Sequence, residues 1–189
     1  MSPLRFISRL ASAAAAMTLL AAVPTLAAAE DSVAAVWAPK EVQFVYQGFT
    51  THYSCDGLQD KIRDMLEKLG ARDLKVRQFA CVRPSGPTLF PGVRVTMQVL
   101  VPAADKDKDK GGGPPVQAQW KSVELMPENA SYNEQGNCEL IEQFKETFLP
   151  LFTTRNVKYA STCVPHQITL GTHLSAEVLA PPAKMASGN

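Results

Sequence analysis

The sequence predicts an α+β fold in which one strand-helix-strand-strand unit occurs twice. Two stretches share a cysteine, then an acid, then an amphipathic helix: Tyr53 to Leu58 and Gly136 to Ile141. The spacing from Cys55 to Cys81 is nearly equal to the spacing from Cys138 to Cys163. Because the pattern recurs at matched spacing, we expect a duplicated unit whose arrangement of strands and helix is ferredoxin-like. Both helices should pack on a mixed sheet, and each unit should hold one disulfide.

Residues 1–29 have the features of a secretory signal peptide. Arg5 and Arg9 form a basic region, an apolar run covers residues 10–23, and the alanines at 27–29 supply a cleavage site. The run ends before it reaches the roughly 20 apolar residues that span a membrane. We therefore expect cleavage near Ala29, a periplasmic or secreted protein, and no stable membrane span after cleavage.

Charge and length limit the class of protein. Cleavage would remove Arg5 and Arg9 and leave residues 30–189, in which basic and acidic side chains are almost equal in number. This length suits one domain or two very small ones. A near-neutral chain with scattered charges lacks the basic patch that nucleic acid requires, so we expect no nucleic-acid partner. The partner would be a protein or a small-molecule ligand of unknown identity.

The first unit is predicted over residues 30–101. Residues 30–40 show no clear period and contain Pro39, so the first strand is expected over Glu41 to Thr50, where β-branched and aromatic residues gather. The next strands are expected over Leu74 to Cys81 and over Val93 to Val101, where apolar and polar residues alternate.

The helix between the first two strands has a clear apolar stripe. Asp56 is the predicted N-cap, with Gln59 completing a capping box, and Gly70 is the predicted stop. The stripe recurs at helical spacing and consists of Leu58, Ile62, Met65, Leu66 and Leu69.

Residues 102–115 are predicted to be a charged, Gly/Pro-rich linker loop, because alternating Asp and Lys residues precede a run of glycines and prolines. The second unit is expected over residues 116–179, and the tail over 180–189 is expected to be disordered. In the second unit, Asn137 is expected to cap a helix that ends near Pro150 and buries Ile141, Phe144 and Phe148. The last strand should bury Ile168, Leu170, Thr172, Leu174, Ala176 and Val178.

The four cysteines are predicted to pair as Cys55–Cys81 and Cys138–Cys163. In a strand-helix-strand crossover the second strand returns parallel to the first and ends at the edge where the helix began. A cysteine at each helix start therefore meets the cysteine at the end of the following strand. Each closed loop should stabilise the fold by about 3 kcal/mol.

Catalysis and metal binding have weaker support. Cys55 lies at a predicted helix start with His52 nearby, an arrangement that can activate a thiol as a nucleophile. However, Cys81 is already its expected disulfide partner. His52, His166 and His173 could contribute to a metal site, yet structural sites usually need four convergent ligands. We expect no cofactor, no metal and no catalytic residue, and leave metal-binding or thiol-dependent function through His52 or His166 as the alternative.

The Tyr-x-Cys-Asp-Gly-Leu stretch, here Tyr53 to Leu58, followed by a cysteine that closes the next strand, here Cys81, resembles uncharacterised secreted bacterial proteins. The resemblance covers the first half best and implies no activity. The first hypothesis is therefore an exported, non-catalytic protein of the envelope or medium that acts by binding. Two candidate surfaces are the meeting of the two halves and the loop from Arg83 to Gly92, which exposes Leu89 and Phe90.

Overall fold

The computed structural model describes residues 32–81, 88–107, 109–126, 137–167 and 172–182. These ranges contain six strands, two α-helices and two 3₁₀ turns: β1 (Val33–Val45), α1 (Cys55–Lys68), β2 (Arg72–Phe79), β3 (Gly92–Pro102), η1 (Ala103–Asp105), β4 (Gly112–Met126), α3 (Cys138–Thr147), η2 (Leu149–Leu151), β5 (Thr154–Ala160) and β6 (His173–Ala180). The predicted signal peptide, and the tail from residue 183 onward, lie outside the described residues.

The chain is an α+β protein with one six-stranded sheet of order β2-β3-β1-β4-β6-β5. Every pair of neighbours is antiparallel, so the predicted mixed sheet is wrong. The reason is that β3 lies between β1 and β2, and β6 lies between β4 and β5. The two parallel strands of each crossover are therefore never hydrogen-bonded to each other.

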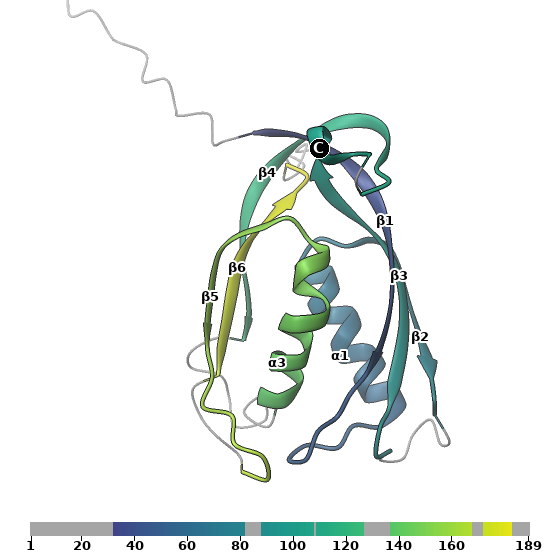
Figure 1. The fold of residues 1–189 in the computed structure, drawn as a ribbon, viewed down its shortest axis with the longest axis vertical. Helices are drawn as coiled ribbons and strands as arrows, with labels where there is room; N and C mark the ends of the chain where they lie inside the picture. The colour runs from purple at the N-terminus through teal and green to yellow at the C-terminus, as the bar shows by residue number, and fades with distance from the viewer. Residues whose placement is uncertain (1–31, 82–87, 108, 127–136, 168–171, 183–189) are drawn as a thin grey trace, which may run out of the picture.

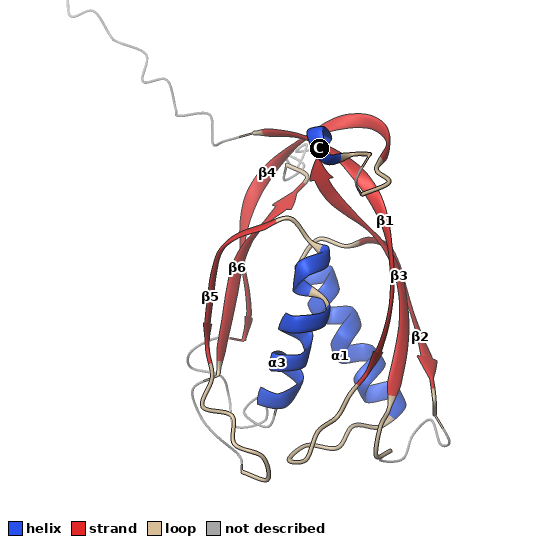
Figure 2. Cartoon of the chain, in the orientation of Figure 1, coloured by secondary structure: helices blue, strands red, loops and turns tan. Residues whose placement is uncertain are grey.

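The sheet is bent into two wings that enclose the helices. We call β1, α1, β2 and β3 the first half, and β4, α3, β5 and β6 the second half. The halves join where β1 pairs with β4, from Val33 opposite Ala118 to Trp37 opposite Gly112. Beyond this seam the wings separate, and both helices lie between them (Figures 1 and 2).

The space between the wings is the main hydrophobic core. As predicted, it contains the helix residues Leu58, Ile62, Leu66, Ile141, Phe144 and Phe148, each no more than 2% exposed. Leu174, Ala176 and Val178 of β6 also face this core, whereas Ile168 and Leu170 lie outside the described residues. Burial of each large apolar side chain contributes about 1.5–3 kcal/mol, so the core fixes the helices against both wings.

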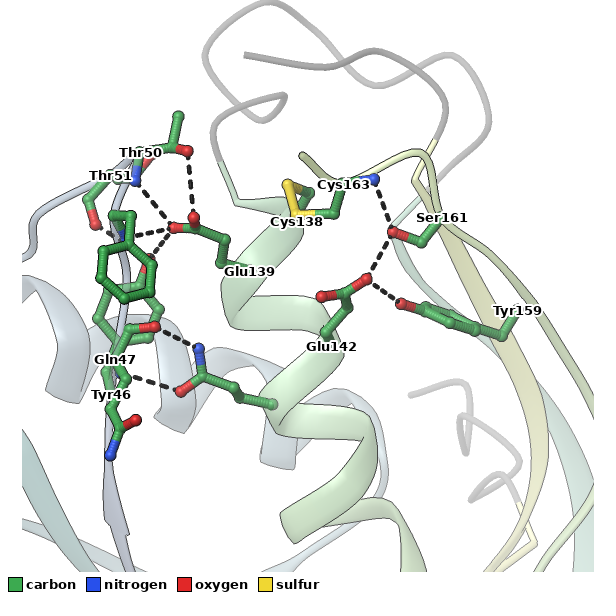
Figure 3. The surroundings of a disulfide bond; sticks show 12 residues. Tyr46, Gln47, Thr50, Thr51, Cys138, Glu139, Glu142, Tyr159, Ser161 and Cys163 are labelled. Atoms are coloured by element: carbon green, nitrogen blue, oxygen red, sulfur yellow. Dashed lines mark hydrogen bonds between the residues drawn. A yellow bond between two sulfur atoms is a disulfide. The ribbon is translucent and has the colours of Figure 1, made fainter. Parts of the chain in front are cut away.

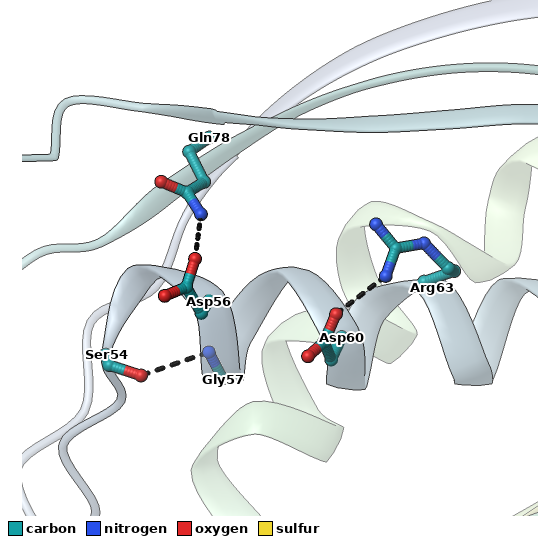
Figure 4. Close-up of polar contacts among 6 residues, drawn as sticks. All are labelled: Ser54, Asp56, Gly57, Asp60, Arg63 and Gln78. Atoms are coloured by element: carbon teal, nitrogen blue, oxygen red, sulfur yellow. Dashed lines mark hydrogen bonds and ion pairs between the residues drawn. The ribbon is translucent and has the colours of Figure 1, made fainter. Parts of the chain in front are cut away.

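Helix α1 begins and ends with recognisable caps. The predicted cap, Asp56, is wrong: Ser54 is the N-cap, and its Oγ accepts a hydrogen bond of 3.0 Å from Gly57 N (Figure 4). Asp56 is exposed in the first turn and accepts a hydrogen bond from Gln78 of β2. At the other end Gly70 adopts φ of 85°, the left-handed conformation favoured after a helix, so it is the predicted stop.

Strand β1 is longer than predicted and contains Pro39. Proline removes a hydrogen-bond donor and is tolerated where a strand has a free edge. Among the described strands, β1 pairs with both neighbours only as far as Trp37, and beyond it pairs with β3 alone. Pro39 lies just past that point, opposite Gln98 of β3. A proline beside an unpaired edge therefore does not end the strand.

The predicted linker is shorter than expected. Residues 112–115 belong to β4, because Gly112 pairs with Trp37 of β1. The connector that remains, residues 103–111, begins with η1 and is held to β1 by a salt bridge of 2.6 Å between Asp109 and Lys40. Ala180 likewise belongs to β6 and is 7% exposed, so the predicted tail begins too early.

Candidate binding groove between the two halves

All four cysteines form disulfides, Cys55–Cys81 and Cys138–Cys163, which is the pairing expected from the sequence spacing. Each bridge joins the first residue of a helix to a cysteine just after the next strand: Cys55 of α1 to Cys81 after β2, and Cys138 of α3 to Cys163 after β5. Both helices begin at the lower end of the molecule in Figure 1. The Cys55 thiol is consumed in its bridge. A thiol-dependent reaction would need a free thiolate, which the oxidised protein does not offer.

The three histidines come from three different segments of the chain. His52 is exposed in the β1–α1 loop, and the His166 ring lies 5.4 Å from the Phe49 ring. The His173 Nε2 lies 3.1 Å from Ser175 Oγ. Within the described ranges no group of three or more His, Cys, Asp or Glu side chains is arranged to hold a metal ion.

The loop predicted to expose apolar residues does so where it is described. Leu89 is 71% exposed and Phe90 is 54% exposed, and Phe49 of the β1–α1 loop is 57% exposed. Residues 83–87 of the predicted loop lie outside the described residues. These single exposed side chains do not by themselves define a concave site.

The start of α3 holds the two halves together through Glu139, which is 6% exposed (Figure 3). Its Oε2 accepts hydrogen bonds from the backbone N–H groups of Phe49, at 2.9 Å, and Thr50, at 3.0 Å. Its Oε1 accepts a third, of 3.1 Å, from the Thr50 hydroxyl. We call this set of contacts the Glu139 clasp. It attaches the β1–α1 loop of the first half to the helix of the second.

Two neighbouring contacts extend the clasp. Gln143 of α3 forms two hydrogen bonds with the backbone of Gln47, of 2.9 and 2.8 Å. The Tyr53 hydroxyl donates to the side chain of Asn137, the residue before α3. The Tyr46 hydroxyl donates to the Thr51 carbonyl at 2.9 Å and lies 3.3 Å from Glu139 Oε2.

The two tyrosines beside the clasp are buried next to the Glu139 carboxylate. Burial raises the pKa of the Tyr46 hydroxyl above its ordinary value, and the nearby Tyr53 and Glu139 raise that pKa further. Burial also raises the pKa of Tyr53, with Glu139 adding to the shift. Both hydroxyls therefore remain protonated donors at neutral pH. The clasp is a structural joint between the halves, since its groups satisfy one another.

At the seam where β1 pairs with β4, the structure has an open groove of about 870 Å³. It lies beside Gly70, Ala71 and Arg72, the residues that follow the end of α1. Both halves contribute to its wall. The lining residues are Trp37, Gly70, Ala71, Arg72, Val116, Gln119, Trp120, Lys121, Ala180 and Pro181. A concave, mainly apolar site of this size with a few polar groups is the usual form of a small-ligand site.

Each tryptophan of the groove carries an arginine over its ring. The Arg72 guanidinium lies 5.2 Å from the centre of the Trp37 ring, and the Arg155 guanidinium lies 4.4 Å from that of Trp120. Both tryptophans are half-buried and pack on a small apolar cluster formed by Ala35, Leu100, Ala118 and Leu179. The stacking orients the rings. The Arg155 guanidinium is also paired with the Glu177 carboxylate at 2.5 Å, so its charge is balanced within the second half.

The described wall of the groove combines apolar surface with a few polar groups. Its wall offers aromatic and aliphatic surface, the amide of Gln119 and the cations of Arg72 and Lys121. Among the lining residues that the structure describes there is no carboxylate, so the charged side chains of this wall are both cationic. This chemistry suits a ligand with an apolar part and a negative charge.

The groove lies where the two halves meet, but its residues were not predicted from the sequence. The meeting of the halves was a predicted surface, whereas Trp37 and Arg72 were not singled out as site residues. A signal was nevertheless present, because the spacing from Trp37 to Trp120 is identical to the spacing from Arg72 to Arg155. We call this spacing the common offset. Comparing the sequence with itself at the common offset identifies both pairs.

In the described parts of the chain no helix is long and apolar enough to cross a membrane. A scan against protein-family models, a search of curated proteins and a search of solved structures each found no match for the chain. The resemblance to secreted bacterial proteins through Tyr53 to Leu58 therefore stays a prediction.

Proposed function

We propose that the chain is an exported, disulfide-stabilised protein that acts by binding, and that the groove between its halves is the binding site. Two disulfides favour an oxidising compartment such as the periplasm or the extracellular medium. The observation that carries the proposal is the groove of about 870 Å³, walled by both tryptophans of the chain. The signal-peptide features of residues 1–29 add an export route.

We further propose that the two halves are copies of one ancestral unit. Residues at equivalent positions are separated by the common offset: Ser54 and Asn137 before the helices, the first helical cysteines, the acids that follow them, the groove tryptophans and the stacked arginines. Each half has the element order strand, helix, strand, strand. Each also inserts its last strand between its first two.

An irregularity shared by the two edge strands supports the same proposal. The register of β2 with β3 shifts between Arg72 and Lys75, and that of β5 with β6 shifts between Arg155 and Lys158. Asp73 and Asn156, at the same place in each shift, adopt left-handed φ angles of 50° and 51°. Bulges are specific structural features of a sheet and not random defects. Two bulges at matched positions favour common descent of the halves.

The proposed function predicts saturable binding of a small amphiphilic anion in the groove. The probe is anilinonaphthalene sulfonate, which has an apolar ring system and one negative charge. Because the chain has two tryptophans and both line the groove, binding should quench their emission by energy transfer to the probe. We expect one saturable transition in a fluorescence titration of the folded protein.

A matched pair of variants locates the binding. Ala71→Phe places a ring in the groove wall and should raise the dissociation constant of the probe at least tenfold. Ala104→Phe adds the same ring to η1, at an exposed residue outside the groove wall, and should leave binding unchanged. Absence of saturable binding, or equal effects of the two variants, would overturn the groove as the binding site.

The alternative of a metal-binding or thiol-dependent protein has less support. It relies on His52 and His166, which lie on different loops, and on the Cys55 thiol, which is bonded to Cys81. Elemental analysis of the purified protein tests the alternative separately from the titration. Stoichiometric zinc, copper or iron would favour it over the binding proposal.

A further inference from the structure

Two residues of the groove have counterparts in the first half at the common offset, and the two pairs differ in solvent exposure. At the common offset, Gln119 and Lys121 of the groove correspond to Val36 and Ala38 of β1. Gln119 is half-buried and Lys121 is exposed, whereas Val36 is 2% and Ala38 is 0% exposed. The equivalent position is therefore filled, and the groove is open.

Val36 and Ala38 belong to the main core, and part of the cover over Val36 is the chain's own connector, described over residues 103–107 and 109–111. Ala103 packs against the main core, and a Cβ added at Gly111 would lie 2.6 Å from Val36 Cγ2. The Asp109 carboxylate forms a salt bridge of 2.6 Å with Lys40 of β1, which holds the far end of the connector. A short polypeptide segment thus occupies this position, with small residues against the core and a carboxylate against a lysine.

The groove has the features needed to accept a comparable segment. Its apolar floor includes Trp37, Val116 and Trp120, which can receive small apolar side chains. Lys121 and Arg72 stand at its polar wall, and Arg72 is 3.6 Å from the exposed carboxylate of Asp73. With two cations in the wall and no carboxylate among the lining residues, the groove favours a negatively charged segment.

We propose that the groove binds a short acidic polypeptide segment of another protein. This inference rests on the proposed function, because it needs the groove to be a binding site and the halves to be equivalent. The chain's own residues 183–189 contain Lys184 and no acidic residue. Charge complementarity therefore favours a partner's acidic segment over residues 183–189.

The test uses a labelled peptide with the sequence of residues 102–111 in which the three lysines are replaced by alanine, so that three aspartates remain. Fluorescence anisotropy should show saturable binding to the full protein, and the peptide should displace anilinonaphthalene sulfonate. Replacing the three aspartates by asparagine should weaken binding at least tenfold. Added salt should also weaken it, since the exposed charges are screened.

Variants of the protein place the peptide. Lys121→Glu should weaken peptide binding at least tenfold, because the groove wall then repels the carboxylates. Lys158→Glu makes the same charge change at an exposed residue of β5 that does not line the groove, and should change affinity less than twofold. Urea unfolding of both variants checks that each retains the fold.

The outcomes separate the two proposals. If the dye binds and the peptide does not, the groove remains a binding site and the acidic segment is wrong. If neither binds, the proposed function fails as well. If the peptide binds only to a chain that ends at Pro182, the chain's own end occupies the groove, and the proposal of a second protein is overturned. Equal binding of the aspartate and asparagine peptides would also overturn it.

Discussion

The starts of the two helices differ more than their matching sequences suggest. In the first half, Ser54 caps its own helix, and the exposed Asp56 accepts a hydrogen bond from β2 of the same half (Figure 4). In the second half, Asn137 makes no side-chain cap, and its side chain accepts from Tyr53 of the other half. The buried Glu139 likewise faces the loop of the other half (Figure 3).

The difference shows that one copy of the pattern serves its own helix while the other joins the halves. An acid in the first turn of a helix is favoured by the helix dipole in either copy. Only in the second copy is the carboxylate buried and given backbone donors from elsewhere. Matched substitutions at equivalent positions therefore measure how much the joint between the halves contributes to stability.

The largest effect is expected for Glu139→Ala. It removes the acceptor of two backbone N–H groups, at Phe49 and Thr50, and a buried donor without a partner costs about 1–3 kcal/mol. We expect the free energy of unfolding in urea to fall by about 4 kcal/mol. The matched change Asp56→Ala, at an exposed carboxylate, should cost about 0.5 kcal/mol. Similar losses for the two variants would remove the distinction between the helix starts.

Removing either disulfide should cost less than removing the clasp carboxylate. The bridges enclose similar loops, with sequence separations of 26 and 25 residues. Paired alanine substitutions at Cys55 and Cys81, or at Cys138 and Cys163, should each lower stability by about 3 kcal/mol through the entropy of the unfolded chain. Thermal and urea unfolding of the two double variants provide the measurement. A difference of more than about 1 kcal/mol would mean that the two bridges do not have equivalent roles.

Alkaline pH should weaken the joint through Tyr46 and Tyr53. Their folded pKa values are raised above the ordinary value of 10.0, mainly by burial, so the folded protein holds protons that the unfolded chain releases. Stability is then fully present below about pH 10 and falls as pH rises further, by about 1.4 kcal/mol per pH unit for each tyrosine. Urea unfolding across this range should show the fall, and Tyr53→Phe should reduce its slope by the share of one tyrosine, about 1.4 kcal/mol per pH unit. An unchanged slope in that variant would contradict the assignment.

The smallest effect is expected at the cap of the first helix. Ser54→Ala removes the acceptor of the Gly57 N–H and should lower stability by about 1 kcal/mol. Ser54→Asp retains a capping oxygen and should lose much less. Urea unfolding compares the variants. A loss of about 4 kcal/mol for Ser54→Ala, as large as that expected for the clasp, would mean that this helix start also supports the joint between the halves.

Local patterns predicted much of the fold. The apolar stripes of both helices and the alternation along β6 depend on side-chain periodicity, which burial reproduces directly. The disulfide pairing depended on the spacing from Cys55 to Cys81 and from Cys138 to Cys163. Strand pairing was not local: the insertion of β3 and β6, which makes the sheet antiparallel, depends on connections whose course the sequence does not specify.

The functional features depended on contacts between distant residues. Asp56 and Glu139 follow their cysteines alike, and nothing adjacent in sequence distinguishes the exposed acid from the buried one. Pro39 predicted that no strand runs through residues 30–40. That prediction failed because β1 separates from β4 beyond the seam, which leaves a free edge where a proline is accommodated. Trp37 and Trp120 come together through that same pairing, so only their common offset was visible beforehand.

The central claim, that both halves build one binding groove, is tested most directly with single-tryptophan proteins. Trp37→Phe leaves Trp120 as the only reporter, and Trp120→Phe leaves Trp37. In a titration with anilinonaphthalene sulfonate, we predict that each remaining tryptophan is quenched and that the two variants give the same dissociation constant within about twofold. Quenching of one tryptophan alone, or two separate dissociation constants, would contradict a single groove shared by the halves.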